Sequence, residues 1–129
     1  MSFANKNVLV TGGTRGIGRS IAEAFAAQGA NVAFTYRSSV AEADALTAEL
    51  DAIGVKAMGI QADAADFEGA EAAVSSIITA WGSIDILVNN AGVTRDGLMI
   101  RMSEADWDAV VGTNLKSVFN YSKAVYRPM

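Results

Sequence analysis

The sequence has no cysteine, no histidine and a single proline among its 129 residues. Disulfide bonds and metal sites built from thiolates or imidazoles are therefore excluded, and the most common catalytic base is missing. We accordingly expect no metal site.

Long apolar runs and an excess of positive charge are also missing. No run approaches the roughly 20 residues needed to cross a membrane, and the N-terminus lacks the apolar core of a signal peptide. The net charge of −4 argues against nucleic acid as a main partner, because phosphate backbones bind to concentrated positive charge. We expect a cytoplasmic protein without nucleic-acid or membrane partners.

The composition is that of a globular domain, with 51% hydrophobic and 19% charged residues. Apolar strand patterns alternate four times with amphipathic helix patterns, which predicts an α/β fold: a Rossmann-type doubly wound parallel sheet, βαβαβαβα, with strand order 3-2-1-4. One domain would span residues 1–129. Strands are predicted at about 7–10, 32–36, 55–61 and 84–88, and helices at about 17–28, 40–53, 67–81 and 103–125.

The stretch from Thr11 to Gly18 lies between the first strand and the first helix, and it contains three spaced glycines. Free backbone N–H groups and the dipole at a helix start attract phosphate. Gly12 would permit a tight turn, whereas Gly16 and Gly18 would remove side chains where the ligand or a neighbouring strand comes close. A flexible loop that binds nothing is the alternative for the glycines alone, and the strand-turn-helix context favours a dinucleotide site.

The end of the second strand indicates which dinucleotide fits. NAD sites usually place an acidic residue there, whereas an arginine accommodates the extra phosphate of NADP. Residues 31–40 contain no acidic residue and include Arg37, and Arg15 lies in the glycine turn. We therefore predict NADP(H) as the cofactor, the alternative being that Arg37 is a solvated loop charge.

Two further segments follow strand ends. Asp63, beside Ala64, is placed to accept a hydrogen bond from adenine, or else to cap a turn or helix. Asn90, Ala91 and Gly92 follow the fourth strand, where small residues let the backbone lie against the nicotinamide ribose. The full predicted cofactor set is Gly12, Thr14, Arg15, Gly16, Ile17, Gly18, Arg37, Asp63, Ala64, Asn90, Ala91 and Gly92.

Together, the glycine turn, Asp63, the Asn89–Gly92 stretch and Asn114 resemble the short-chain dehydrogenase/reductase family. The stretch Asn90-Ala91-Gly92-Val93-Thr94-Arg95-Asp96, with Trp107 and Thr113-Asn114-Leu115, is similar to its 3-oxoacyl-acyl-carrier-protein and acetoacetyl-CoA reductases. The resemblance implies NADPH-dependent reduction of a 3-oxoacyl thioester in fatty-acid or polyhydroxyalkanoate metabolism, and a homo-oligomer. It also implies that Asn114 is catalytic, holding a water in the proton relay and fixing a kink in its helix.

The family's catalytic serine, tyrosine and lysine would lie past residue 129. Tyr121 and Lys123 are two residues apart, so on a helix they face different ways and do not replace that pair. We expect the chain to be the cofactor-binding part of a reductase and to be inactive alone. A non-catalytic or truncated NADP-binding module that associates through its strand edge is one alternative. A methyltransferase using S-adenosylmethionine is another, disfavoured by Arg37.

Overall fold

A computed structural model describes residues 3–92 and 101–129. Its four parallel strands have the predicted order, β3-β2-β1-β4. Their bounds are β1 (Asn7–Val10), β2 (Asn31–Tyr36), β3 (Ala57–Gln61) and β4 (Ile86–Val88). The third and fourth strands therefore each begin two residues later than predicted. Val93, Thr94, Arg95 and Asp96, which contribute to the family resemblance, lie outside the described residues.

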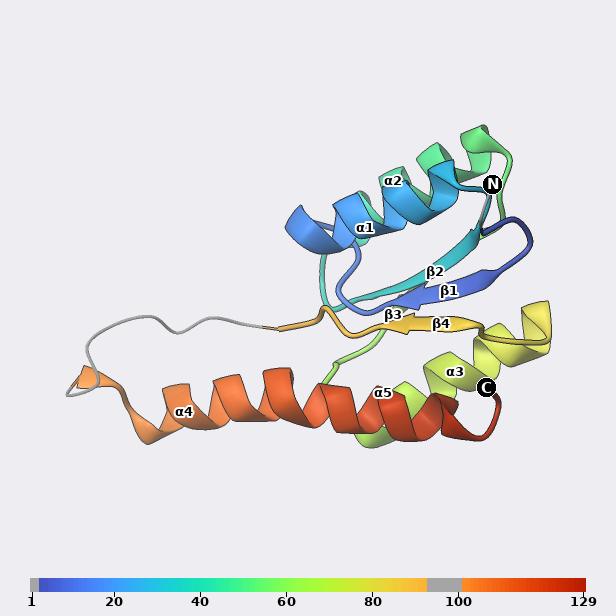
Figure 1. Cartoon of the computed structure of the whole chain (residues 1–129). Helices are drawn as coiled ribbons and strands as arrows, with labels where there is room; N and C mark the ends of the chain where they lie inside the picture. Colours follow the sequence, from blue (N-terminus) through green and yellow to red (C-terminus); the bar gives the residue numbers. More distant parts are fainter. Residues whose placement is uncertain (1–2, 93–100) are drawn as a thin grey trace.

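Helices cover both faces of the sheet (Figure 1). Helices α1 (Gly16–Ala27) and α2 (Val40–Ile53) lie on one face, and α3 (Phe67–Trp81) and α5 (Lys116–Tyr126) lie on the other. Asp66 caps α3, because its side chain accepts a hydrogen bond from the Glu68 N–H. None of the helices in the described part is long and apolar enough to span a bilayer.

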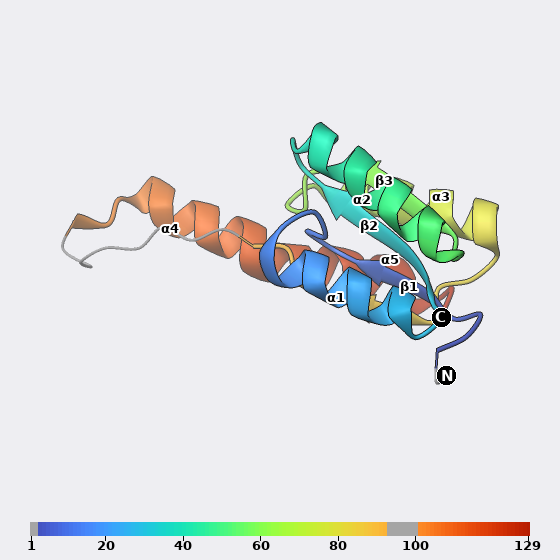
Figure 2. The same ribbon diagram turned by 90° about the horizontal axis from the view of Figure 1, so that it is seen from above.

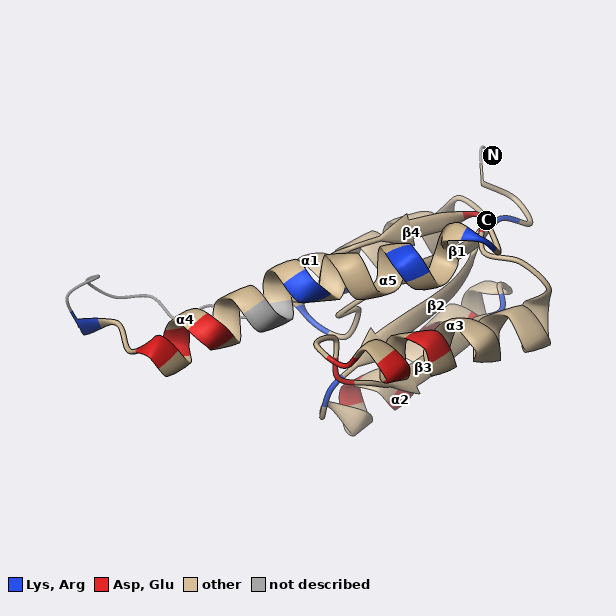
Figure 3. Cartoon of the chain, turned by 90° about the horizontal axis from the view of Figure 1, so that it is seen from below, with Lys and Arg blue, Asp and Glu red and all other residues tan. Residues whose placement is uncertain are grey.

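The predicted last helix is divided into three parts. Helix α4 (Glu104–Val110) and α5 are joined by a π-helix, η2 (Val111–Leu115). Ser103 and Asp106 form a capping box at the start of α4, where acidic residues gather and suit the positive end of the helix dipole (Figure 3). Figures 1 and 2 both show α4 extending beyond the sheet. A π turn inserts an extra residue into a helix, and here that turn contains Asn114.

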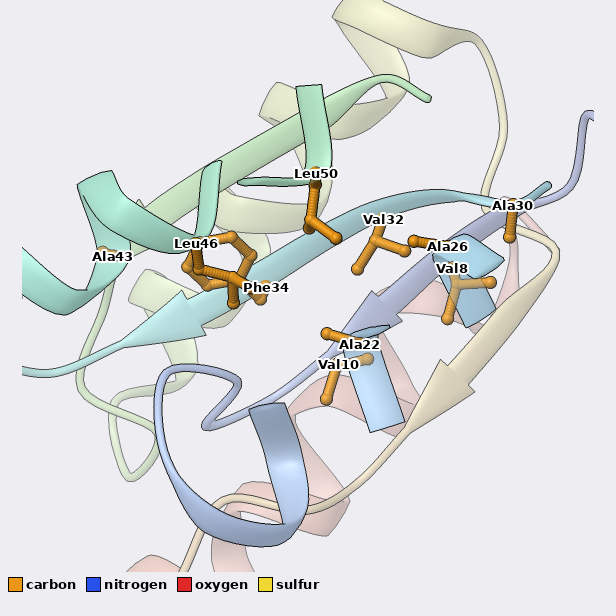
Figure 4. Close-up of a cluster of buried hydrophobic side chains, with 10 residues drawn as sticks. All are labelled: Val8, Val10, Ala22, Ala26, Ala30, Val32, Phe34, Ala43, Leu46 and Leu50. Atoms are coloured by element: carbon orange, nitrogen blue, oxygen red, sulfur yellow. The ribbon is translucent and has the colours of Figure 1, made fainter. Parts of the chain in front are cut away.

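The core lies on both faces of β1 and β2. Val8, Val10 and Phe34 pack against α1 and α2, where small residues such as Ala22 let the helix approach the sheet closely (Figure 4). Leu9 and its neighbours pack against α3 and α5 on the other face. The residues of strand β4 are only half-buried, and among the described strands β4 pairs with β1 alone.

Candidate functional site

A cavity of about 440 Å³ opens at the carboxyl ends of the four strands. Four segments surround it: the glycine turn after β1, the end of β2, the segment after β3 and the turn after β4. Such a position, where the strand order reverses between β1 and β4, is where open α/β sheets bind ligands. The lining residues are Gly12, Thr14, Arg15, Thr35, Tyr36, Arg37, Ser38, Ser39, Ala62, Asp63, Ala64, Asn90, Ala91 and Gly92.

Thr35 fixes the glycine turn to the end of β2. Its hydroxyl accepts a hydrogen bond from the Gly12 N–H at 3.1 Å, and its carbonyl accepts one from the Gly13 N–H at 3.0 Å. Thr35 is buried, so these bonds are shielded from water. Nothing in the sequence marks Thr35 as part of a site, because a threonine in a strand is an ordinary strand-forming residue.

Thr11 joins the glycine turn to the turn after β4. Its hydroxyl oxygen, which is fully buried, accepts hydrogen bonds from the backbone N–H groups of Asn90 at 3.0 Å and Ala91 at 2.9 Å. In the other direction, the Asn90 side-chain amide donates to the Gly12 carbonyl at 3.0 Å. The two turns therefore form one hydrogen-bonded unit, which gives Asn90 a structural role.

Two glycines of the turn are needed for different reasons. A Cβ on Gly18 would overlap the Gly12 carbonyl oxygen and the Asn90 side-chain amide, so the predicted close approach is present. Gly16 has nothing within 4 Å of its Cβ position, but its φ of +56° is in the left-handed region. The left-handed backbone gives Gly16 a conformational role, and no described protein atom approaches it closely; the predicted close approach of a ligand stays a prediction.

Most of the predicted cofactor residues line the cavity. The exceptions are Gly16, Ile17 and Gly18, which begin α1 and are not among the lining residues; the Ile17 side chain is 74% exposed. Asn114 is not a lining residue either. Its side chain nevertheless lies against the turn after β4, because a Cβ on Gly92 would come within 2.8 Å of the Asn114 Oδ1 atom.

The charged residues of the cavity give it a positive side. Arg15 and Arg37 are both exposed, and within the described residues neither makes an ion pair. Arg19, outside the cavity, is instead bound to Glu49 at 2.6 Å and to Glu23 at 3.4 Å. Asp63 accepts a hydrogen bond from the Ala65 N–H at 3.0 Å. It therefore makes a turn contact, which is one of the two roles predicted for it.

Neither Tyr121 nor Lys123 reaches the cavity lining. Tyr121 is fully buried against the sheet, and this burial raises the pKa of its phenol. The Lys123 ammonium lies over the rings of Phe67 and Phe119, 5.5 and 5.7 Å from their centroids. The two side chains thus face different surroundings, as their spacing predicts.

A four-stranded parallel sheet with helices on both faces and a glycine turn at its switch point defines a Rossmann-type fold. Residues 6–129 match the family model described as short chain dehydrogenase. The chain belongs to this family, which confirms the resemblance.

Curated relatives include two reductases of the same name. The chain is 50% identical over 115 residues to 3-oxoacyl-[acyl-carrier-protein] reductase FabG of Staphylococcus aureus, covering 89% of the chain and 47% of that protein. It is 44% identical over 129 residues to FabG of Escherichia coli K12, covering 100% of the chain and 51% of that protein. The chain therefore spans about half the length of these relatives.

Solved structures of short-chain dehydrogenases also match the fold of the chain. A short chain dehydrogenase from Burkholderia cenocepacia in complex with NADP superposes with a TM-score of 0.96 at 43% identity, covering 100% of the chain and 53% of that structure. A short-chain dehydrogenase/reductase from Serratia marcescens gives 0.95 at 38% identity, with the same coverages. The fold predicted from the sequence is thus confirmed.

Proposed function

We propose that this chain is the cofactor-binding part of an NADPH-dependent reductase of 3-oxoacyl thioesters carried on acyl carrier protein or CoA. The observation that carries the proposal is the pair of exposed arginines, Arg15 and Arg37, on a cavity bounded by the glycine turn. The names of the reductase relatives and the NADP complex of a similar structure support it.

The residues present fit a dinucleotide phosphate. Helix α1 begins after Arg15 without a side-chain cap, so its first N–H groups are available to a pyrophosphate. The guanidinium groups of Arg15 and Arg37 offer charge-assisted hydrogen bonds to a 2′-phosphate. When bound, the reduced nicotinamide would supply the hydride that the reaction needs.

Asn114 is the catalytic residue that we propose within this chain. The η2 turn holds its side chain against the Gly92 turn, where the nicotinamide end would lie. We propose that Asn114 holds a water of the proton relay. Because Tyr121 is buried and Lys123 faces aromatic rings, we also propose that the 129-residue chain alone does not reduce a ketone.

The test is a fluorescence titration of the chain with NADPH and NADH in parallel. We expect NADPH to bind at least tenfold more tightly, a difference of about 1.4 kcal/mol. Arg37→Ala is expected to abolish this preference while changing NADH affinity little, because only NADPH carries the phosphate.

Arg127→Ala is the matched control, because Arg127 is an exposed arginine that does not line this cavity. It is expected to leave the preference unchanged. Equal affinity of the wild-type chain for NADPH and NADH, or an unchanged preference in Arg37→Ala, would contradict the proposal.

We further propose that the chain associates with copies of itself. Large apolar side chains stand exposed along the last helical segment: Trp107, Leu115, Val118, Phe119 and Tyr126. Light scattering at increasing concentration is expected to show dimers or larger species, with less association in Phe119→Ser. A monomer at every concentration would refute it.

A further inference from the structure

Helix α5 is joined to the cavity by the buried side chain of Asn120, which nothing in the sequence marks as part of the site. Asn120 is fully buried, and its Nδ2 group donates a hydrogen bond to the Ala64 carbonyl at 3.1 Å. The two residues are 56 positions apart in the sequence. This hydrogen bond holds α5 against a loop that is far from it in the sequence.

The segment that receives this bond lines the cavity. Asp63 and Ala64 are both lining residues, and they follow the end of β3. A local turn shapes the segment: Ala65 N–H donates to the Asp63 side chain at 3.0 Å and Asp66 N–H donates to the Asp63 carbonyl at 2.9 Å. These bonds set the form of the turn, whereas the Asn120 amide sets its place relative to α5.

The orientation of the Asn120 amide follows from its partner. Only its N–H group can face a carbonyl oxygen, because the flipped amide would place two acceptors against each other. Its Oδ1 atom is then buried with no partner among the described residues, an arrangement that costs free energy. An aliphatic side chain of similar size would avoid that cost, so the contribution specific to asparagine here is the bond to Ala64.

The same helical run contacts the cavity at a second place. Six residues earlier, Asn114 lies against Gly92 in the turn after β4, so the run from η2 to α5 meets two of the four segments around the cavity. We propose that Asn120 is a positioning residue, whose amide holds the Asp63–Ala64 turn where the adenosine end of the dinucleotide would lie. This inference rests on the proposed function.

The first test compares two halves of the dinucleotide by calorimetry. Adenosine 2′,5′-bisphosphate probes the adenosine end, and reduced nicotinamide mononucleotide probes the other end. In Asn120→Leu, we expect the affinity for the bisphosphate to fall by about fivefold, the effect of one lost hydrogen bond, and that for the mononucleotide to stay within twofold. A purely structural role would weaken both ligands equally, and equal weakening would overturn the proposal.

The matched control is Tyr121→Phe, on the neighbouring buried residue of α5. The Tyr121 hydroxyl makes no hydrogen bond to the Asp63–Ala64 turn and lies near the Thr35 side chain instead, so its removal is expected to leave the ratio of the two affinities unchanged. Asn120→Ala serves as a second variant should leucine prevent folding, with the same selective loss expected. Selective loss in Tyr121→Phe as large as in Asn120→Leu would count against a specific role for the amide.

A ligand-free measurement separates this inference from the proposed function. Amide hydrogen exchange at Ala65 and Asp66 is expected to accelerate in Asn120→Leu relative to the Leu9 amide in the core strand β1. Unchanged relative exchange would overturn the positioning role even if the cofactor binds. Failure of the wild-type chain to bind the bisphosphate would instead refute the proposed function.

Discussion

Replacing Thr11 by valine is expected to lower the free energy of unfolding by about 3 kcal/mol. The side chain keeps its shape, but the backbone N–H groups of Asn90 and Ala91 lose the hydroxyl oxygen that both of them contact. Each unpaired buried donor costs roughly 1–3 kcal/mol. Urea unfolding followed by circular dichroism measures the change, and dinucleotide affinity is expected to fall with it because the turn after β4 is released.

Thr11→Ser is the matched control, because serine keeps the hydroxyl and removes only a methyl group. It is expected to cost about 1 kcal/mol, the transfer free energy of one buried methyl. If Thr11→Val were no more destabilising than Thr11→Ser, the hydroxyl would not be what holds the two turns together.

Gly18→Ala is expected to destabilise the chain by about 3 kcal/mol and to reduce NADPH binding more than its loss of stability explains. A Cβ there meets the Gly12 backbone and the Asn90 amide, and backbone cannot move aside as a flexible side chain does. The turn must therefore open. Thermal unfolding gives the stability change, and titration with NADPH on the folded variant gives the affinity.

Gly16→Ala provides the comparison within the same turn. Its Cβ meets nothing within 4 Å, so only the left-handed backbone conformation is penalised, at about 1 kcal/mol. A Gly16→Ala variant as unstable as Gly18→Ala would show that backbone conformation, not close packing, makes both glycines necessary.

The structure bears out the features of the sequence that depend on local pattern. Periodic apolar residues predicted four strands and the helices between them, because a strand and a helix each bury one repeating set of positions. Helices α3 and α4 begin after Asp66 and Ser103, whose side chains accept hydrogen bonds from N–H groups of the first turn, and such caps are local features of the sequence. Strand order followed from the handedness of parallel connections.

The π turn could not be predicted from pattern. The apolar positions before and after Asn114 are compatible with one continuous helix, and only the family resemblance implied a kink at Asn114, where the structure has the π turn. The late starts of β3 and β4 are of the same kind. A strand begins where a neighbouring strand pairs with it in register, and Ala57 and Ile86 are the first residues of β3 and β4 that have such a register partner.

By itself, the sequence determined the fold, the family and the segments around the cavity, because each depends on residues close together in the chain. Only the tertiary structure decided how those segments are joined. The side-chain hydrogen bonds of Thr11, Thr35 and Asn120 connect residues between 23 and 80 positions apart, and each donor or acceptor is an ordinary polar residue until its partner is known. Hydrogen bonds at such separations leave no periodic signal in the sequence, since they depend on where the folded backbone places each group.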